Sequence, residues 1–153
     1  MKRAFIGTMS ALAIAGVATI STVVPGMAAA NAPTVSDAGS LDRGEDHFVE
    51  VDVEGFALDR IRVVCVTFHE LSDVEVSGVS AVSSVDYGFE EFTVTFDEAV
   101  PVGDTVRITM LDSKVRGRLS GLTVPYRIFG YSEELGEIPL GTAVVVVPEV
   151  TGR

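Results

Sequence analysis

The chain has 153 residues, a formal net charge of −11 and one cysteine, Cys65. This length allows one domain with a single core and excludes a large multidomain protein. An acidic protein repels nucleic acid and anionic membrane surfaces through its long-range field, so neither is an expected partner. A lone cysteine makes no internal disulfide, so the apolar core must stabilise the fold.

Residues 1–30 predict a secretory signal peptide. Lys2–Arg3 forms a positive n-region, residues 4–24 are uncharged and apolar or small, and three alanines match a signal-peptidase site. We expect cleavage after Ala30, with cleavage after Ala32 as the alternative. The apolar run is long enough for an uncleaved anchor, but its small residues and the adjoining site favour cleavage.

The signal predicts an extracytoplasmic protein, periplasmic or secreted. The general secretory route is expected because no arginine pair precedes the apolar run. Removal of the two basic residues of the signal would leave a mature net charge of −13. No membrane span is expected after signal cleavage, because no second apolar segment is long enough. Residues 31–46 lack periodicity and predict a flexible leader.

After this leader, apolar residues recur with period two, which predicts strands. Residues 48–54 alternate valines with acids. Residues 58–71 predict a longer strand with Arg60 and Arg62 on one face and aliphatic residues on the other. Residues 73–79 predict a short strand that ends at a glycine.

The segment VTFDEAVPVGDTVRITM, around Pro101 and Gly103, predicts two strands and a connection. Residues 92–96 and 105–110 both alternate, so each needs one face toward the core. Proline cannot donate to a ladder and glycine permits a positive φ, so the link between the strands reads as a turn. Residues 97–104 are too long for a tight hairpin, and we expect a structural arch between two sheets.

The remaining segments also predict strands. Residues 122–131 alternate but contain Pro125, which predicts an edge position or a bulge. Residues 132–137 allow one short helical turn. The run TAVVVV at 142–147 is continuously apolar and predicts a fully buried strand.

About seven short strands with turns between them predict an all-β fold, a single antiparallel β-sandwich over residues 47–150. A small β-barrel is the alternative. No window shows a sustained helical stripe of apolar residues, which argues against helices in this domain.

The chain shows no catalytic motif, and we do not expect an enzyme. Cys65 and His69 are copper-ligand types, but along a strand their Cα atoms would lie about 13 Å apart, too far for one ion. The acidic stretches 42–46 and 96–104 carry oxygen ligands suited to calcium but match no spaced calcium loop. We therefore expect no catalytic residue, no metal site and no cofactor.

A cluster of basic residues stands out in this acidic chain. Lys114, Arg116 and Arg118 place three of the nine mature positive charges within seven residues. At a hairpin tip they would form a candidate contact for an anion or an acidic partner. The alternative is a solvated loop whose charges offset nearby acids.

The stretch VTFDEAVPVGDTVRI resembles the central motif of a family of uncharacterised secreted proteins, found mainly in cyanobacteria and defined only as a domain of unknown function. A later stretch, YRIFGYSEELGEIPLG, is similar to the aromatic strand and Leu-Gly pair of that family. The residues that fit are Phe96, Val100, Pro101, Gly103, Thr105, Val106, Tyr126, Phe129, Leu140 and Gly141. The resemblance implies an extracytoplasmic β domain and brings no known catalytic residues.

These observations predict an exported, non-enzymatic binding or structural β domain at the cell envelope or outside it. The alternative is a periplasmic protein that binds a cation or metal. The candidate partners are an envelope or extracellular protein and a polysaccharide. The sequence is compatible with each of these partners.

Overall fold

The computed structural model describes residues 32–41, 45–66, 69–79, 81–115 and 123–148. These residues form eleven strands, and none of them lies in a helix. Accordingly, this part of the chain contains no helix that is long and apolar enough to cross a membrane. The expected signal peptide at 1–30 lies outside the described residues and stays a prediction.

A four-stranded antiparallel sheet forms one layer of the domain. Its strand order is β1–β2–β8–β5. The bounds are Thr34–Leu41 for β1, Asp46–Asp52 for β2, Thr105–Leu111 for β8 and Asp73–Ser77 for β5.

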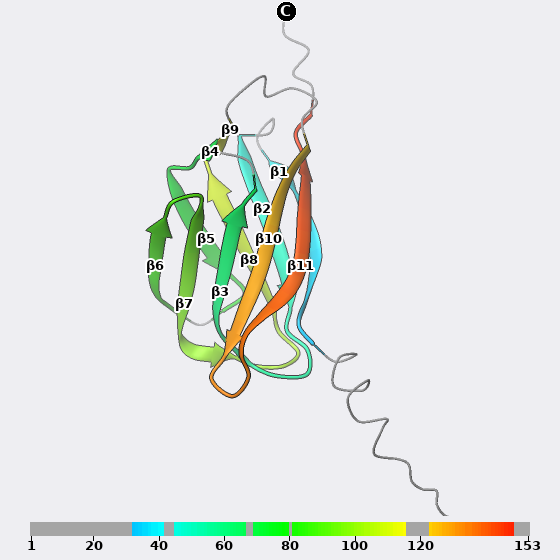
Figure 1. Ribbon diagram of the computed structural model, residues 1–153, viewed down its shortest axis with the longest axis vertical. Helices are drawn as coiled ribbons and strands as arrows, with labels where there is room; N and C mark the ends of the chain where they lie inside the picture. The colour runs from blue at the N-terminus through cyan, green and yellow to red at the C-terminus, as the bar shows by residue number, and fades with distance from the viewer. Residues whose placement is uncertain (1–31, 42–44, 67–68, 80, 116–122, 149–153) are drawn as a thin grey trace, which may run out of the picture. The chain divides into compact units, whose positions relative to one another are not determined.

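A five-stranded antiparallel sheet forms the second layer, with the order β11–β10–β3–β7–β6 (Figure 1). The bounds are Gly136–Val146 for β11, Thr123–Ser132 for β10, Leu58–Cys65 for β3, Glu91–Val100 for β7 and Val82–Gly88 for β6. Two short strands, β4 (His69–Glu70) and β9 (Lys114–Val115), pair in a small separate sheet.

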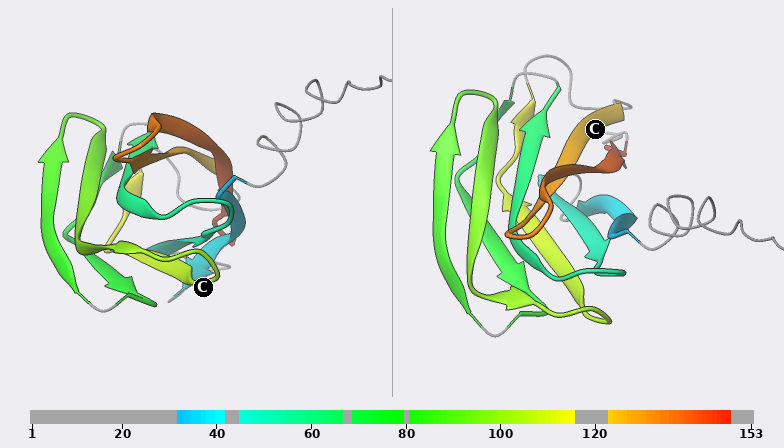
Figure 2. Two further views of the ribbon diagram at one scale, coloured as in Figure 1. Left: turned by 90° about the horizontal axis from the view of Figure 1, so that it is seen from below. Right: turned by 60° about the horizontal axis from the view of Figure 1, so that its bottom comes forward.

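The core lies between the two sheets, because each long strand turns alternate residues inward. Residues of this core that are at most 1% exposed include Val51, Ile61, Val94, Ile108 and Tyr126. The sheets pack face to face without joining into a closed barrel. Figure 2 shows the strands from below and in a view tilted by 60°. The predicted sandwich is therefore confirmed, and the barrel alternative is wrong.

The predicted flexible leader at 31–46 is wrong for most of its length. Thr34–Leu41 forms β1, which pairs along β2 at the edge of the four-stranded sheet. Val35 and Ala38 pack against the core, while most of the other side chains are polar. An edge strand needs few apolar residues, so its sequence shows little alternation. The same reason explains why β6 was not predicted.

The connection between β7 and β8 is the predicted arch, but it is shorter than expected. Strand β7 runs to Val100, so residues 101–104 alone cross from the five-stranded to the four-stranded sheet. Gly103 has a φ of 105°, in the region that favours glycine. Its N–H donates to the carbonyl of Val53 at 2.8 Å, which fastens the arch to the residue after β2.

Pro125 was expected at an edge strand or a bulge, but it lies in β10, which is an inner strand. The irregularity in the pairing of β10 with β11 lies between Ile128 and Phe129, and not at Pro125. The carbonyl of Pro125 accepts from the N–H of Val66 at 3.3 Å, one residue past the end of β3. Nitrogen and carbonyl of one residue point to the same side of an antiparallel strand. Because proline has no N–H, Pro125 makes one hydrogen bond fewer to β3, and this loss falls at the end of the β3–β10 pairing.

Strand β11 is an edge strand, so the prediction of a fully buried strand at 142–147 is wrong. Its residues alternate, with Ala143 and Val145 buried and Val144 and Val146 exposed. Residues 133–135 form the turn of the β10–β11 hairpin, where a short helical turn was expected. The predicted strand at 58–71 ends at Cys65.

Candidate functional site

The basic cluster predicted from the sequence falls largely outside the described residues. Lys114 lies in β9, where its backbone pairs with Glu70. Arg116 and Arg118 belong to a segment that the structure does not describe. A contact of these residues with an anion or a partner therefore stays a prediction.

Cys65 ends β3 with its side chain in the core, 4% exposed. Burial raises the pKa of its thiol to about 12, with a further contribution from the nearby Glu90 carboxylate.

Among the described residues, no group of three or more His, Cys, Asp or Glu side chains could hold a metal ion. Asp46, from the acidic stretch considered for calcium, instead accepts a hydrogen bond from the backbone of Asp112 at 2.9 Å.

A polar cluster lies inside the sandwich, at the end where β3 finishes. His47 is fully buried on the inner face of β2. Its Nδ1 lies 2.5 Å from the hydroxyl of Tyr126. That hydroxyl also bonds to Ser113, and burial strongly raises its pKa. The cluster connects the two sheets, and we interpret it as a contribution to stability and not as a functional site.

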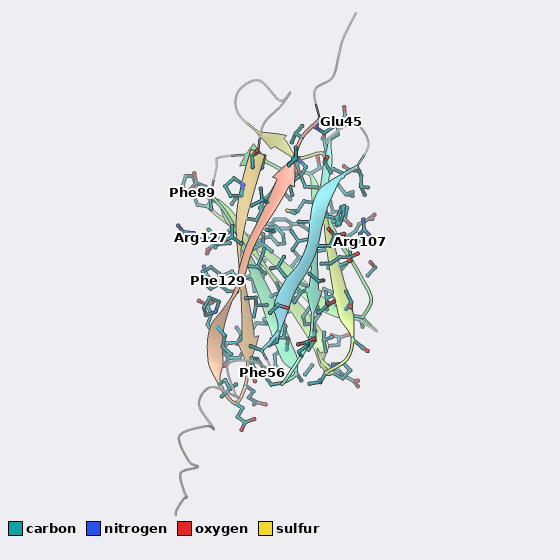
Figure 3. The ribbon with its side chains drawn as sticks, turned by 90° about the vertical axis from the view of Figure 1, so that its right-hand side faces the viewer. Glu45, Phe56, Phe89, Arg107, Arg127 and Phe129 are labelled. Atoms are coloured by element: carbon teal, nitrogen blue, oxygen red, sulfur yellow. The ribbon has the colours of Figure 1, made fainter. Side chains whose placement is uncertain are left out.

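The outer face of the five-stranded sheet offers a more exposed arrangement. Strands β3 and β10 are neighbours, and both turn long side chains outward. We call this surface the arginine–aromatic face, and it consists of Arg60, Arg62, Arg127, Phe129 and Tyr131. Arg127 and Phe129 project from this side of the molecule in Figure 3.

Guanidinium groups stack on aromatic rings across the two strands. Arg60 pairs with Tyr131 in register, and its Cζ lies 4.0 Å from the ring centroid. Arg62 and Phe129 repeat this contact one row along, at 4.4 Å. Such contacts lie well inside the range of cation–π attraction. They hold four long side chains in fixed orientations.

Two carboxylates complete the arrangement. Arg62 donates two hydrogen bonds to Glu137, at 2.6 and 2.9 Å, and one to Glu91 at 2.8 Å. The bond to Glu137 is the main cause that raises the pKa of Arg62, and it lowers the pKa of Glu137 in return. A depression of about 130 Å³ lies among Arg60, Arg62, Phe129, Tyr131 and Glu137.

The four-stranded sheet carries one similar group, in which an arginine is stacked on an aromatic ring and bonded to a carboxylate. Arg107 lies 3.8 Å from the ring centroid of Phe48 and donates to Glu50 at 3.0 Å. Figure 3 shows Arg107 on the side of the molecule away from Phe129. Of the four arginine side chains that the structure describes, three therefore lie on the arginine–aromatic face.

Sequence reasoning placed Arg60 and Arg62 on one face of a strand but did not identify a site there. The sequence feature that could have revealed this site is the alternation of arginines and aromatic residues on the outward positions of two strands that are far apart in the sequence. Their juxtaposition depends on the pairing of β3 with β10. Alternation shows which residues share a face of one strand, but it does not show which strands are neighbours.

No protein-family model matches the chain, and no curated protein matches it. The resemblance to the secreted family of unknown function therefore stays a prediction.

Several solved structures resemble part of this chain in fold, at low sequence identity. A variant of BcpA, the major pilin subunit of Bacillus cereus, matches 76% of this chain and 40% of its own, with 14% identity and a TM-score of 0.46. The collagen-binding domain of the Erysipelothrix rhusiopathiae surface protein RspB matches 76% and 46%, with 13% identity and a TM-score of 0.42. The chain thus spans less than half the length of these two structures.

The collagen-binding domain of a Staphylococcus aureus adhesin is covered over 96% of its length by 76% of this chain, with 9% identity and a TM-score of 0.41. At these TM-scores and identities, the likenesses carry no argument about function. The fold assignment rests on the two sheets themselves.

Proposed function

We propose that this chain is an exported, non-enzymatic binding domain that acts at the cell envelope or outside it. Its binding surface is the arginine–aromatic face, and its ligand is an uncharged polysaccharide. The observation that carries this proposal is the pair of stacked contacts, Arg60 on Tyr131 and Arg62 on Phe129. They present ordered planar side chains on an open sheet face.

The charge balance of the face favours an uncharged ligand. Its three arginines are matched by Glu91, Glu137 and the outward Asp86 of the edge strand β6. The whole chain has a net charge of −11, so its long-range field repels a polyanion. A strongly anionic polymer would therefore be repelled at a distance and would meet no excess of positive charge on this face.

The chemistry of the face suits sugar rings. Adjacent hydroxyls of a sugar both donate and accept, and Arg62 presents guanidinium donors beside the carboxylate acceptors of Glu91 and Glu137. Phe129 and Tyr131 are half-buried, so part of each ring remains available for the apolar C–H surface of a sugar. Because the contacts already fix these side chains, binding costs little side-chain entropy.

Affinity electrophoresis tests the proposal. The mature protein would be run in gels containing soluble glucans, mannans or galactans, with polygalacturonate as the anionic comparison. We expect retardation by at least one neutral polymer and its loss in Tyr131→Ala and Arg60→Ala. Phe48→Ala is the matched control, because it removes a ring stacked on an arginine from the opposite sheet, and it should keep full retardation.

The proposal fails if no neutral polymer retards the protein. It also fails if polygalacturonate alone does so, or if Phe48→Ala reduces binding as much as Tyr131→Ala. Circular dichroism melting of each variant shows whether a loss of binding reflects a loss of folding.

A further inference from the structure

A second hollow is lined by residues of the β6–β7 hairpin, the end of β3 and the segment before β5. The strands that carry these residues are labelled in Figure 1. The volume of the hollow is about 360 Å³. We call it the hairpin hollow, and its lining residues are Cys65, Leu71, Ser72, Tyr87, Gly88, Glu90, Glu91 and Phe92. Its lining residues come from the end of β3, from the segment that leads into β5 of the other sheet, and from the β6–β7 hairpin. This volume is at the small end of the range for small-molecule sites.

The floor of the hairpin hollow is apolar and aromatic. Phe92 and Cys65 are buried core residues, and Leu71 packs against them from the segment that leads into β5. Tyr87 lies opposite Phe92 across the hairpin, with the ring centroids 6.4 Å apart and the rings tilted by 42°. The ring of Tyr87 is 54% exposed and can offer its negative face to a cation in the hollow, whereas Phe92 is buried in the core.

The charges around the hollow are negative. Glu90 and Glu91 line it. The hydroxyl of Tyr87 donates to Asp73 at 3.2 Å, and the hydroxyl of Ser72 donates to Asp112 at 2.8 Å, which brings two further carboxylates to its rim. Arg62 engages Glu91 from the outer face. Every charged residue among the described lining residues is an acid.

The polar groups on the floor stay neutral at physiological pH. Burial raises the pKa of the Cys65 thiol to about 12, and the Glu90 carboxylate contributes to this rise. Glu90 therefore lies close enough to influence a thiol on the floor. Burial, aided by Asp73, also raises the pKa of Tyr87. The charge that a ligand meets is that of the carboxylates.

We propose that the hairpin hollow binds a small organic cation, an alkylated or quaternary ammonium group on a short chain. The apolar floor takes the alkyl groups, the exposed ring of Tyr87 attracts the cationic head, and Glu90 supplies the counter-charge. A metal ion does not suit an apolar floor, and an anion is repelled by the rim. Glu91 lines this hollow and also pairs with Arg62 of the arginine–aromatic face, but the residues proposed to contact the cation, Tyr87 and Glu90, lie outside that face. The proposal does not depend on polysaccharide binding.

Isothermal titration with two probes of the same shape tests the charge requirement. Choline carries the quaternary ammonium group, and 3,3-dimethyl-1-butanol replaces its nitrogen with carbon. We expect saturable binding of choline that weakens with added salt, and binding of the neutral analogue that is weaker by about 2- to 30-fold, the range of a cation–π contribution.

Two variants and a control locate the site. Glu90→Gln keeps the size of the side chain and removes its charge, so it should weaken choline binding several-fold without changing the melting temperature. Tyr87→Leu should weaken it further. Glu98→Gln is the control, because it removes the same charge at an exposed position near the arch, outside the hollow.

Absence of choline binding at millimolar concentrations would overturn the proposal. Equal binding of the two probes would also overturn it, because the hollow would then be a merely apolar site. An equal loss in Glu98→Gln and Glu90→Gln would show attraction by the overall charge alone and would contradict a built site. If Tyr87→Leu does not fold, the comparison of Glu90→Gln with Glu98→Gln still decides.

Discussion

The hydroxyl of Tyr126 lies between the sheets, where it meets the imidazole of His47 from β2 and the hydroxyl of Ser113. A polar group in a dry interior is tolerated when its hydrogen bonds are made, and it is costly when one partner is removed. The three residues come from three distant parts of the chain. They therefore fix how the two sheets sit on each other at this end of the sandwich.

We expect Tyr126→Phe to lower the free energy of unfolding by about 1–3 kcal/mol, because it removes the hydroxyl that His47 and Ser113 contact. Urea denaturation measures the change. Tyr131→Phe is the control, since it removes a hydroxyl from the outer face of the same strand. It should change stability by less than about 0.5 kcal/mol. Equal effects would show that the buried cluster contributes nothing specific.

The thiol of Cys65 gives stability a dependence on alkaline pH. Its pKa is raised from 9.0 to about 12 in the folded protein. Above pH 9.0 the unfolded chain loses this proton while the folded protein keeps it, so unfolding becomes easier as the pH rises. This contribution is fully present below pH 9.0 and is lost progressively toward pH 12.

Urea denaturation between pH 8.5 and 10 should therefore show stability falling by up to about 1.4 kcal/mol per pH unit. Cys65→Ala should flatten this slope, because it removes the titrating group. Val63→Ala truncates a buried neighbour on the same face of β3, so it should lower stability at every pH and keep the slope. A slope that is unchanged in Cys65→Ala would contradict the assigned burial.

At the scale of elements, sequence periodicity predicted the strands that have one face fully in the core, because each buried position repeats every second residue. It failed at the edges of the sheets. The run of valines in β11 looked buried, yet Val144 and Val146 point to solvent from an edge strand. Strands β1 and β6 turn only a few aliphatic residues inward, so polar residues dominate their sequences.

Substitution of two glycines in the connections between strands tests whether these connections require a positive φ. Gly103 in the arch has a φ of 105° and no atom within 4 Å of an added Cβ, so Gly103→Ala should cost about 1–3 kcal/mol through backbone strain alone. Gly78, after β5, has a φ of 86°, and an added Cβ would lie 2.1 Å from the carbonyl oxygen of Thr105. Gly78→Ala should therefore cost more.

Chemical denaturation compares both variants with Asp97→Asn. Asp97 is exposed on β7, and its change should stay within about 0.5 kcal/mol. A neutral Gly103→Ala would show that the arch does not require the positive φ. A Gly78→Ala variant that is milder than Gly103→Ala would contradict the close approach of β5 to Thr105.

At the scale of the whole molecule, the sandwich turns two different surfaces outward. The four-stranded sheet sets Glu50, Asp52 and Glu75 around Arg107, whereas the five-stranded sheet balances three arginines with carboxylates. Sequence analysis found the acidity of the chain and the shared face of Arg60 and Arg62. It could not find the stacked rings, because these come from β10, more than sixty residues later.

We have proposed that the arginine–aromatic face binds an uncharged polysaccharide. Side-chain NMR signals of the arginine Nε–H groups test it most directly, in a titration with an oligosaccharide of whichever neutral polymer retards the protein. We expect shifts at Arg60, Arg62 and Arg127, and an unchanged signal from Arg107 on the opposite sheet. Shifts at Arg107 with none at the other three would contradict it.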